Sequence, residues 1–246
     1  MTKSHCRYVA HLDILGMSAI MGKDPEEAWS MLSSLVDARD SSTNVSLEFR
    51  GRSELIHVPE HIKAVTFSDT VFLFTLGDTE ADLRALTIVV GQMFSNSIYN
   101  RVPIRVGVAK GDLFVNFERS MYAGPALIEA YHVGESSQWL GATFAPSVAD
   151  DVAALGLVAG EPGVQASNVV VPWPVPMKNS IENMMVLNWP ALMAHQLKID
   201  PPFTAEVFYE IFEPTFGCFA ELPQDVRVKY ENTVAFFNVQ HAAHVA

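Results

Sequence analysis

The sequence predicts an α+β domain in which helices cover an antiparallel sheet, followed by a C-terminal extension. Three observations support this class. Residues 1–156 alternate short runs of β-branched and aromatic residues with stretches of helical periodicity, in the order β-α-β-β-α-β. The chain has 246 residues and is 49% hydrophobic, enough for one sizeable core. Residues 157–246 lack this alternation and are rich in Pro and Trp.

The first strand and helix are predicted at residues 7–13 and 24–38. RYVAHLD is a short, mostly apolar run that suits a strand. In the helix, Asp24 is placed to cap the first turn, Pro25 takes the first helical position and Glu27 lies three residues after the cap. Apolar residues then recur at helical spacing, so one face of this helix should pack on the sheet.

A hairpin and a long helix come next. The polar stretch 39–60 is expected to be a loop. Residues 62–78, IKAVTFSDTVFLFTLGD, contain two strand-forming runs on either side of Ser68-Asp69, which predicts a tight turn there. Residues 79–99 begin with acids in the first turn, as helices favour.

The second half of the repeat is predicted from four segments. Residues 102–116 suggest two strands joined by a turn at 110–112, Lys-Gly-Asp. A short strand at 121–124 precedes a helix at 125–139 that begins with proline. A short strand and a last helix fill residues 140–156.

This order of elements is that of a ferredoxin-like βαββαβ core with additions. Right-handed crossovers then place the helices on one face of the sheet. We divide the chain into a core at 1–156 and an extension at 157–246, which we expect to form irregular strands and two short helices packed on the core.

The bulk composition narrows the function classes. The net charge of −12 and the absence of a long basic run argue against a general nucleic-acid binder. Only 18% of residues are charged, so we expect a partner subunit to cover some apolar surface. Two cysteines make neither a disulfide framework nor a zinc pattern. No signal peptide and no membrane-spanning run are visible, and we expect a cytoplasmic protein.

Two acids are the candidate metal ligands. Asp13 ends the first strand, and Asp69 lies at the tip of the neighbouring hairpin. Adjacent strands would bring both carboxylates together, where they repel unless a cation lies between them. Mg²⁺ or Mn²⁺ suits such a site, with the carbonyl of Ile14 as a further ligand. Alone, either acid would more commonly be a turn or capping residue.

The residues after Asp13 are candidates for binding phosphates. Ile-Leu-Gly-Met-Ser contains a glycine, Gly16, that lets the backbone turn, and the N–H groups of Gly16 and Met17 are expected to face a triphosphate. Two metal ions on paired acids, next to such a turn, are suited to in-line displacement at phosphorus.

Three segments resemble one enzyme family in order and spacing. HLDILGMS resembles the first metal motif of class III nucleotide cyclase catalytic domains, VTFSDTVFLF the second, and IRVGVAKGDLFV the strand with Arg-x-Gly. The resemblance covers about residues 7–150. It implies that Asp13 and Asp69 bind two divalent metal ions while a ribose 3′-hydroxyl attacks the α-phosphorus and pyrophosphate leaves.

The chain departs from that family at the positions that recognise purines and stabilise the transition state. The base-reading Lys and Asp of adenylate cyclases fall at Val65 and Met121. The helix that carries Asn and Arg in the family is ALIEAYHVGESS here, which places His132 at the Arg position. Arg105, Lys110 or His132 are the candidates to replace the missing stabilisation, and we assign Arg105 and His132 as catalytic.

These departures most resemble the pyrimidine cyclases of Pycsar antiphage systems. The resemblance implies UTP or CTP as substrate, with cyclic UMP ranked first, and dependence on Mn²⁺ (or Mg²⁺). It also implies a homodimer with sites at the subunit interface and a separate effector protein that the product activates. Phe67 and Tyr122 are expected to narrow the base site, and Thr66 to bond the pyrimidine edge. The alternative is a degenerate cyclase fold that binds nucleotide or a protein without turnover.

Overall fold

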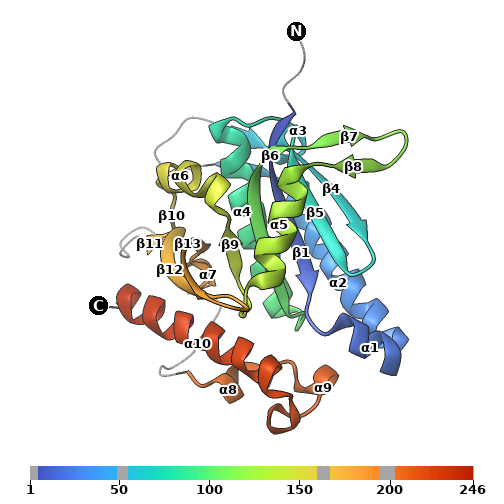
Figure 1. Cartoon of the computed structure of the whole chain (residues 1–246), viewed down its shortest axis with the longest axis vertical. Helices are drawn as coiled ribbons and strands as arrows, with labels where there is room; N and C mark the ends of the chain where they lie inside the picture. The colour runs from blue at the N-terminus through green and yellow to red at the C-terminus, as the bar shows by residue number, and fades with distance from the viewer. Residues whose placement is uncertain (1–4, 49–54, 160–166, 194–202, 246) are drawn as a thin grey trace.

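The computed structural model describes residues 5–48, 55–159, 167–193 and 203–245 (Figure 1). Its main sheet has seven strands in the order β12-β13-β9-β6-β1-β5-β4, and every neighbouring pair is antiparallel except β6 and β9. The strands are β1 (Cys6–Ile14), β4 (Ile62–Phe67), β5 (Thr70–Thr75), β6 (Ile104–Asp112), β9 (Ala142–Phe144), β12 (Val170–Pro176) and β13 (Ile181–Leu187).

Smaller ladders and the helices surround this sheet. The ladders pair β2 (Ser46–Glu48) with β3 (Leu55–His57), β7 (Phe114–Asn116) with β8 (Met121–Ala123), and β10 (Val158–Ala159) with β11 (Ser167–Asn168). The helices are α1 (Met17–Lys23), α2 (Pro25–Thr43), α3 (Val58–His61), α4 (Glu80–Tyr99), α5 (Pro125–Ser136), α6 (Pro146–Ala154), α7 (Trp189–Met193), α8 (Ala205–Tyr209), α9 (Glu213–Phe216) and α10 (Gln224–Val245).

The predicted α+β core is confirmed, with β1, α2, β4, β5, α4 and β6 forming the βαββαβ unit. The caps follow the sequence signals. The Asp24 side chain accepts a hydrogen bond from the Glu27 backbone N–H, and Thr79 and Asp82 form a capping box at α4. The turn at Ser68-Asp69 also lies where it was predicted, between β4 and β5. Two helices, α1 and α3, were not predicted, and α2 continues to Thr43 into the expected loop.

The helices lie on both faces of the sheet, so the expectation of a single helical face is wrong. Helices α2 and α4 pack together behind β1, β4 and β5, whereas α5 crosses in front of β1 and β6 (Figure 1). The crossover rule governs only the helices inside the βαββαβ unit, and α5 follows that unit.

Glycine at position 107 allows α5 to approach the sheet closely. A Cβ atom on Gly107 of β6 would lie 2.0 Å from the backbone oxygen of Ala130 in α5. Gly134, one turn further along α5, faces the same spot, where its own Cβ would lie 3.1 Å from the Gly107 nitrogen. The Arg-x-Gly pattern of this strand therefore has a packing reason. The close contact between Gly107 and α5 also sets how near the end of α5 lies to Arg105 on β6.

The predicted turn at 110–112 is wrong. Strand β6 runs through Lys110 to Asp112, where it pairs with Tyr8, Arg7 and Cys6 of β1. The long β1 supplies a pairing partner for the whole segment, and this partner overrides the local turn preference of Lys-Gly-Asp. The hairpin instead begins later, with β7 and β8.

The extension is more regular than expected. Strands β12 and β13 join the main sheet through β9, so the sheet continues across residue 156. The expected pair of short helices is replaced by α7, α8, α9 and a helix of 22 residues, α10. The core fixes α10 in place, because Asn232 donates to the Gln138 carbonyl at 2.7 Å and Thr233 accepts from the Leu140 N–H at 2.8 Å.

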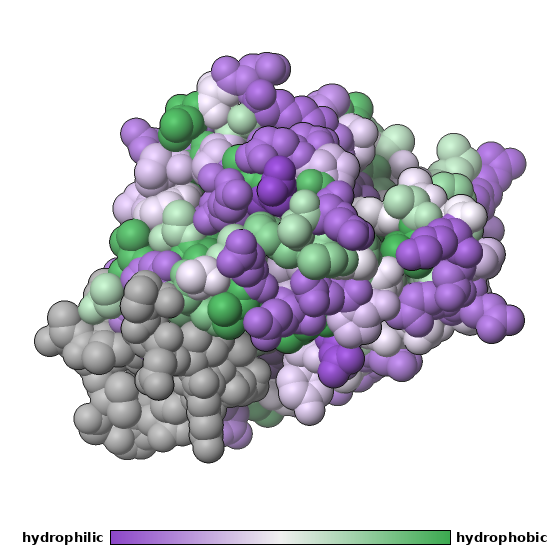
Figure 2. Space-filling view, turned by 90° about the horizontal axis from the view of Figure 1, so that it is seen from below, coloured by the Kyte–Doolittle hydropathy of each residue, from purple (hydrophilic) through white to green (hydrophobic). Residues whose placement is uncertain are grey.

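Aromatic contacts complete this packing, with Phe236 of α10 meeting both Trp139 and Trp173 at 5.0 Å between ring centroids. Among the described residues, no helix is both long and apolar enough to cross a membrane. Figure 2, which looks at the end of the molecule formed by α8–α10, shows small groups of hydrophobic residues separated by hydrophilic ones.

Candidate active site

Asp13 and Asp69 lie on neighbouring backbone positions. Asp13, the next-to-last residue of β1, lies between Thr70 of β5 and Arg105 of β6, and the Ile14 N–H donates to the Asp69 carbonyl at 3.4 Å. The sheet order that places β1 beside the β4–β5 hairpin produces this proximity. Burial raises the pKa of Asp13 despite the attraction of Arg105, and the negative charge of Asp69 raises it further.

Arg105 is the centre of a buried charge cluster beside Asp13. Its Nε and Nη2 atoms donate to Asp13 Oδ2 at 3.0 and 2.9 Å, and its Nη1 donates to the Glu135 carbonyl at 3.1 Å. Nη2 also pairs with the Glu135 carboxylate, which in turn accepts from Lys178 at 2.6 Å. The guanidinium thus holds two acids from two different elements, β1 and α5.

Glu135 and Lys178 are site residues that sequence inspection missed. Burial opposes ionisation of Glu135, but the bond from Lys178 and the charge of Arg105 outweigh it and lower the pKa of that carboxyl. Lys178 lies in the β12–β13 turn, far from Arg105 in the chain. No local pattern marked either residue, since only the packing of α5 and of the extension brings them to Arg105.

His11 lies on the same face of β1 as Asp13 and is 5% exposed. Its ring packs between Phe72 and Tyr131, at centroid distances of 5.1 and 5.2 Å. Burial, with a contribution from Arg105, lowers the pKa of His11 to about 4. The imidazole is therefore neutral near pH 7 and adds no charge to the cluster.

The predicted phosphate loop has the expected turn. Gly16 has φ 80°, a left-handed conformation that glycine adopts without strain, and α1 starts immediately after it. The Met17 side chain is buried, so only its backbone can face a ligand. A Cβ on Gly16 would lie 2.9 Å from the Phe216 ring of α9, which shows that the extension packs directly on this turn.

The structure brings Phe67 and Tyr122 together in the lining of one cavity of about 480 Å³ beside β4 and β5. The same lining includes Val65, Thr66 and Phe72. The Thr66 hydroxyl instead accepts a hydrogen bond from Arg39 of α2, at 2.6 Å, on the opposite face. Successive strand residues alternate between faces, so the Thr66 hydroxyl lies on the other face of β4 from the Phe67 ring, and its bond to a pyrimidine edge stays a prediction.

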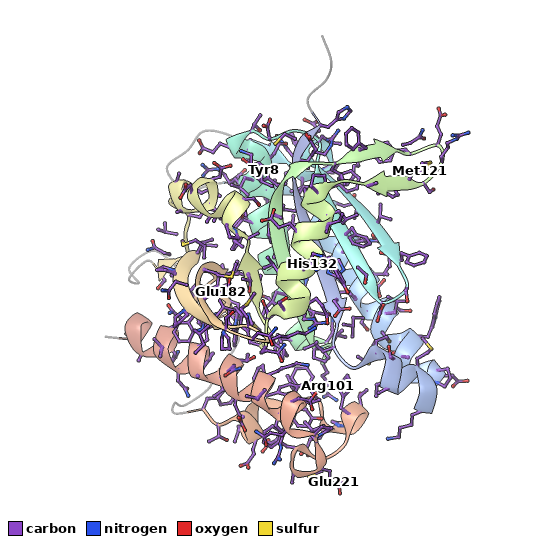
Figure 3. All side chains as sticks on the ribbon, in the orientation of Figure 1. Tyr8, Arg101, Met121, His132, Glu182 and Glu221 are labelled. Atoms are coloured by element: carbon purple, nitrogen blue, oxygen red, sulfur yellow. The ribbon has the colours of Figure 1, made fainter. Side chains whose placement is uncertain are left out.

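His132 does not join the cluster around Asp13 within one chain. It is exposed on α5 and lines a separate cavity with Met177 and Glu182, and Figure 3 shows it on the outer side of that helix, apart from Met121 on the β7–β8 hairpin. The α5 residues that approach the cluster are Tyr131 and Glu135. The assignment of His132 as catalytic stays a prediction.

The donor atoms around Asp13 fit a hard divalent cation. Two carboxylates and the Ile14 carbonyl offer only oxygen ligands, which Mg²⁺ and Mn²⁺ prefer. Both hydrogen bonds from Arg105 fall on Oδ2 of Asp13. Within the described residues no group of three His, Cys, Asp or Glu side chains is arranged around one point, so further ligands would come from phosphates and water.

Solved structures identify the fold. The dimeric guanylyl cyclase domain of the RhoGC fusion protein from Blastocladiella emersonii superposes with a TM-score of 0.53 at 13% identity, over 74% of this chain and 96% of that one. The guanylate cyclase domain of RhGC from Catenaria anguillulae, in complex with GTP, gives 0.50 at 12% identity, over 74% and 96%. A rhodopsin-guanylyl cyclase core of converted specificity, in complex with ATPαS, gives 0.53 at 11%, over 75% and 95%.

The chain therefore has the fold of class III nucleotidyl cyclase catalytic domains. No protein-family model matches it, and no curated protein matches it in sequence.

Proposed function

We propose that this protein is a nucleotide cyclase that converts UTP to 3′,5′-cyclic UMP and pyrophosphate. The observation that carries the proposal is the placement of Asp13 beside Asp69 and Arg105 on a cyclase fold. The structures that support the fold are those of guanylyl cyclase domains, one with GTP and one with ATPαS bound.

In this proposal Asp13, Asp69 and the Ile14 carbonyl hold two divalent ions, Mn²⁺ or Mg²⁺. When bound, these ions lower the pKa of the ribose 3′-hydroxyl and balance the charge of the triphosphate. Backbone N–H groups at Gly16 and Met17 face the phosphates. The 3′-oxygen forms a bond to the α-phosphorus, the bond to the β-phosphate oxygen breaks, and the hydroxyl proton passes to solvent.

Arg105 supplies charge stabilisation in the same site. Its guanidinium is buried and held in a fixed orientation by Asp13 and Glu135, so it needs little reorganisation when negative charge develops on the phosphates. Lys178 pairs with Glu135, so Arg105 is not the only cation that balances that carboxylate.

The base preference rests on what lines the β4–β5 cavity. Val65 and Met121 occupy the positions where purine cyclases carry polar base-reading residues, and Phe67 and Tyr122 reduce the room for a base. A smaller base fits such a site better, which favours UTP or CTP over purine nucleotides. Cytidylate cyclase activity, with cyclic CMP as product, is the alternative within this proposal.

We also propose a homodimer with two shared sites. Four large hydrophobic side chains of β4, β8 and α5 are 45–76% exposed, and a partner subunit would cover them: Phe67, Met121, Ile128 and Tyr131. In a head-to-tail pair, His132 of α5 would serve the site of the other chain. The wider role we propose is a cytoplasmic one: antiphage defence, through a separate effector protein activated by the cyclic pyrimidine.

The test is incubation of purified protein with Mn²⁺ and each of the four ribonucleoside triphosphates, followed by chromatography of the products. Cyclic UMP with pyrophosphate is the expected result, and the Asp69→Ala variant is the control. Pyrophosphate release with none of the four would favour the second candidate, a nucleotide-binding protein without turnover. Arg105, which already pairs with Asp13, is the feature that favours that candidate.

A further inference from the structure

A second cavity lies between α1 and the C-terminal helices, on the other side of the Gly16 turn from α5. Its volume is about 300 Å³, at the small end of ligand-binding cavities in proteins. The wall is mostly apolar and draws on three separate segments. Its members include Leu15, Gly16, Ala19, Tyr209, Phe216 and Lys229.

Two lysines line the cavity, an exposed one, Lys23, and a partly buried one, Lys229, and the buried one points to a class of ligand. It belongs to α10 and is partly buried, and within the described residues no carboxylate lies in ion-pair contact with it. Burial, with a contribution from Arg105, lowers the pKa of Lys229. A half-buried ammonium group at an apolar wall is costly unless an anion accompanies it.

Tyr209 gives a second, independent observation at the same cavity. The side chain is fully buried, and its hydroxyl has no hydrogen-bond partner in the described part of the chain. Buried hydroxyl groups without a partner are uncommon, and they mark places where a water molecule or a ligand completes the structure. Its ring packs edge-on against Tyr230, which also lines the cavity, at 4.7 Å between centroids.

We propose that this cavity binds a small apolar molecule carrying one carboxylate group. The apolar body would contact Leu15, Phe216 and the neighbouring aliphatic wall, while the carboxylate would pair with Lys229. The apolar wall disfavours a polyphosphate, and the ammonium disfavours a cationic ligand.

The cavity borders the turn that follows Asp13. Phe216 packs on Gly16, the turn that follows Asp13, and Lys229 lies in the field of Arg105 and Glu135. The binding claim nevertheless depends only on the cavity. It is tested without measuring nucleotide turnover, so its failure and that of the proposed function are separate results.

The probe is 4-fluorophenylacetate, and fluorine NMR measures its binding to the full-length protein. We expect binding by the unmodified chain, about tenfold weaker binding by Lys229→Met, and about threefold weaker binding by Tyr209→Phe, which keeps the ring and the packing. Ala19→Phe, which fills the cavity, should abolish binding. Lys63→Met, on β4 outside the cavity, is the matched control and should bind as the unmodified chain does.

The charge-reversed analogue, 4-fluorophenethylammonium, should not bind. Equal affinity of the two probes would overturn the proposal, as would unchanged affinity in Lys229→Met and Tyr209→Phe, or no binding of the carboxylate probe by the unmodified chain. Circular dichroism of each variant identifies loss of folding, and the Tyr209 variant decides the question if the Lys229 variant does not fold.

Discussion

Arg105 donates two hydrogen bonds to one oxygen of Asp13, Oδ2, at 3.0 and 2.9 Å. The pair joins the two central strands β1 and β6, 92 residues apart in the chain. Without a metal ion, this guanidinium is the positive charge nearest to the acid that we assign as a metal ligand. Arg105 therefore supports the folded state as well as the proposed chemistry.

Replacing Arg105 with Met should destabilise the protein by about 2–3 kcal/mol, because Asp13 is left partly buried near Asp69 and Glu135 without a cation. Urea unfolding measures this. Addition of Mn²⁺ should return part of the lost stability, since the ion binds only the folded arrangement of the two aspartates. The same urea midpoint for the Arg105 variant with and without Mn²⁺ would contradict the metal assignment.

Asp13→Ala and Asp69→Ala should each reduce cyclic nucleotide formation by at least about 10³-fold while the circular dichroism spectrum stays unchanged. Both acids lie at the end of β1 or in the adjacent turn, outside the main hydrophobic core. Asp40→Ala, on the outer surface of α2, is the control and should retain full activity. Normal turnover in either site variant would remove both acids from the mechanism.

A mixture of inactive chains should recover activity if each site is shared between two chains. Asp13→Ala and His132→Ala are combined in equal amounts; half of the random dimers are then mixed, and each mixed dimer has one complete site. About a quarter of the unmodified activity is expected, measured as pyrophosphate release. Absence of any recovery, with mixed dimers shown by sedimentation, would place His132 outside the site.

Gly107→Ala should lower the free energy of unfolding by about 3 kcal/mol, because the added methyl group meets the Ala130 carbonyl at 2.0 Å. The displaced α5 would also carry Glu135 away from Arg105. Gly22→Ala is the matched control, since a Cβ there has no neighbour within 4 Å, and the variant should be slightly more stable. Thermal unfolding compares the two, and equal melting temperatures would contradict the packing argument.

The Lys110–Asp151 ion pair should give a defined acid dependence of stability. The bond from Lys110 lowers the pKa of Asp151, so its contribution is present above the unfolded pKa and is lost as the pH falls through the folded value. Asp151→Asn should therefore be less stable than the unmodified chain at about pH 7 and equally stable at about pH 2. Urea midpoints at both pH values test this, and a constant difference between the chains would exclude the pair as its source.

The sequence by itself determined the core elements and the two acids. The cap at Asp24, the acids in the first turn of the helix at 79–99, the strand runs around Ser68-Asp69 and the apolar run before Asp13 are local signals, and each acts within a few residues. Their order then placed Asp13 beside Asp69, because the βαββαβ unit allows few arrangements.

Only the tertiary structure decided what surrounds those acids. Glu135 of α5 pairs with Arg105, Lys178 of the β12–β13 turn pairs with Glu135, and the charge of Arg105 acts on Lys229 of α10. No spacing in the chain relates these three residues. The tertiary structure also decided the conformation at Lys110, where pairing of β6 with β1 outweighed the local preference for the predicted turn. Local sequence specifies elements through short-range energies, whereas a charge cluster of this kind depends on long-range packing that no window of sequence contains.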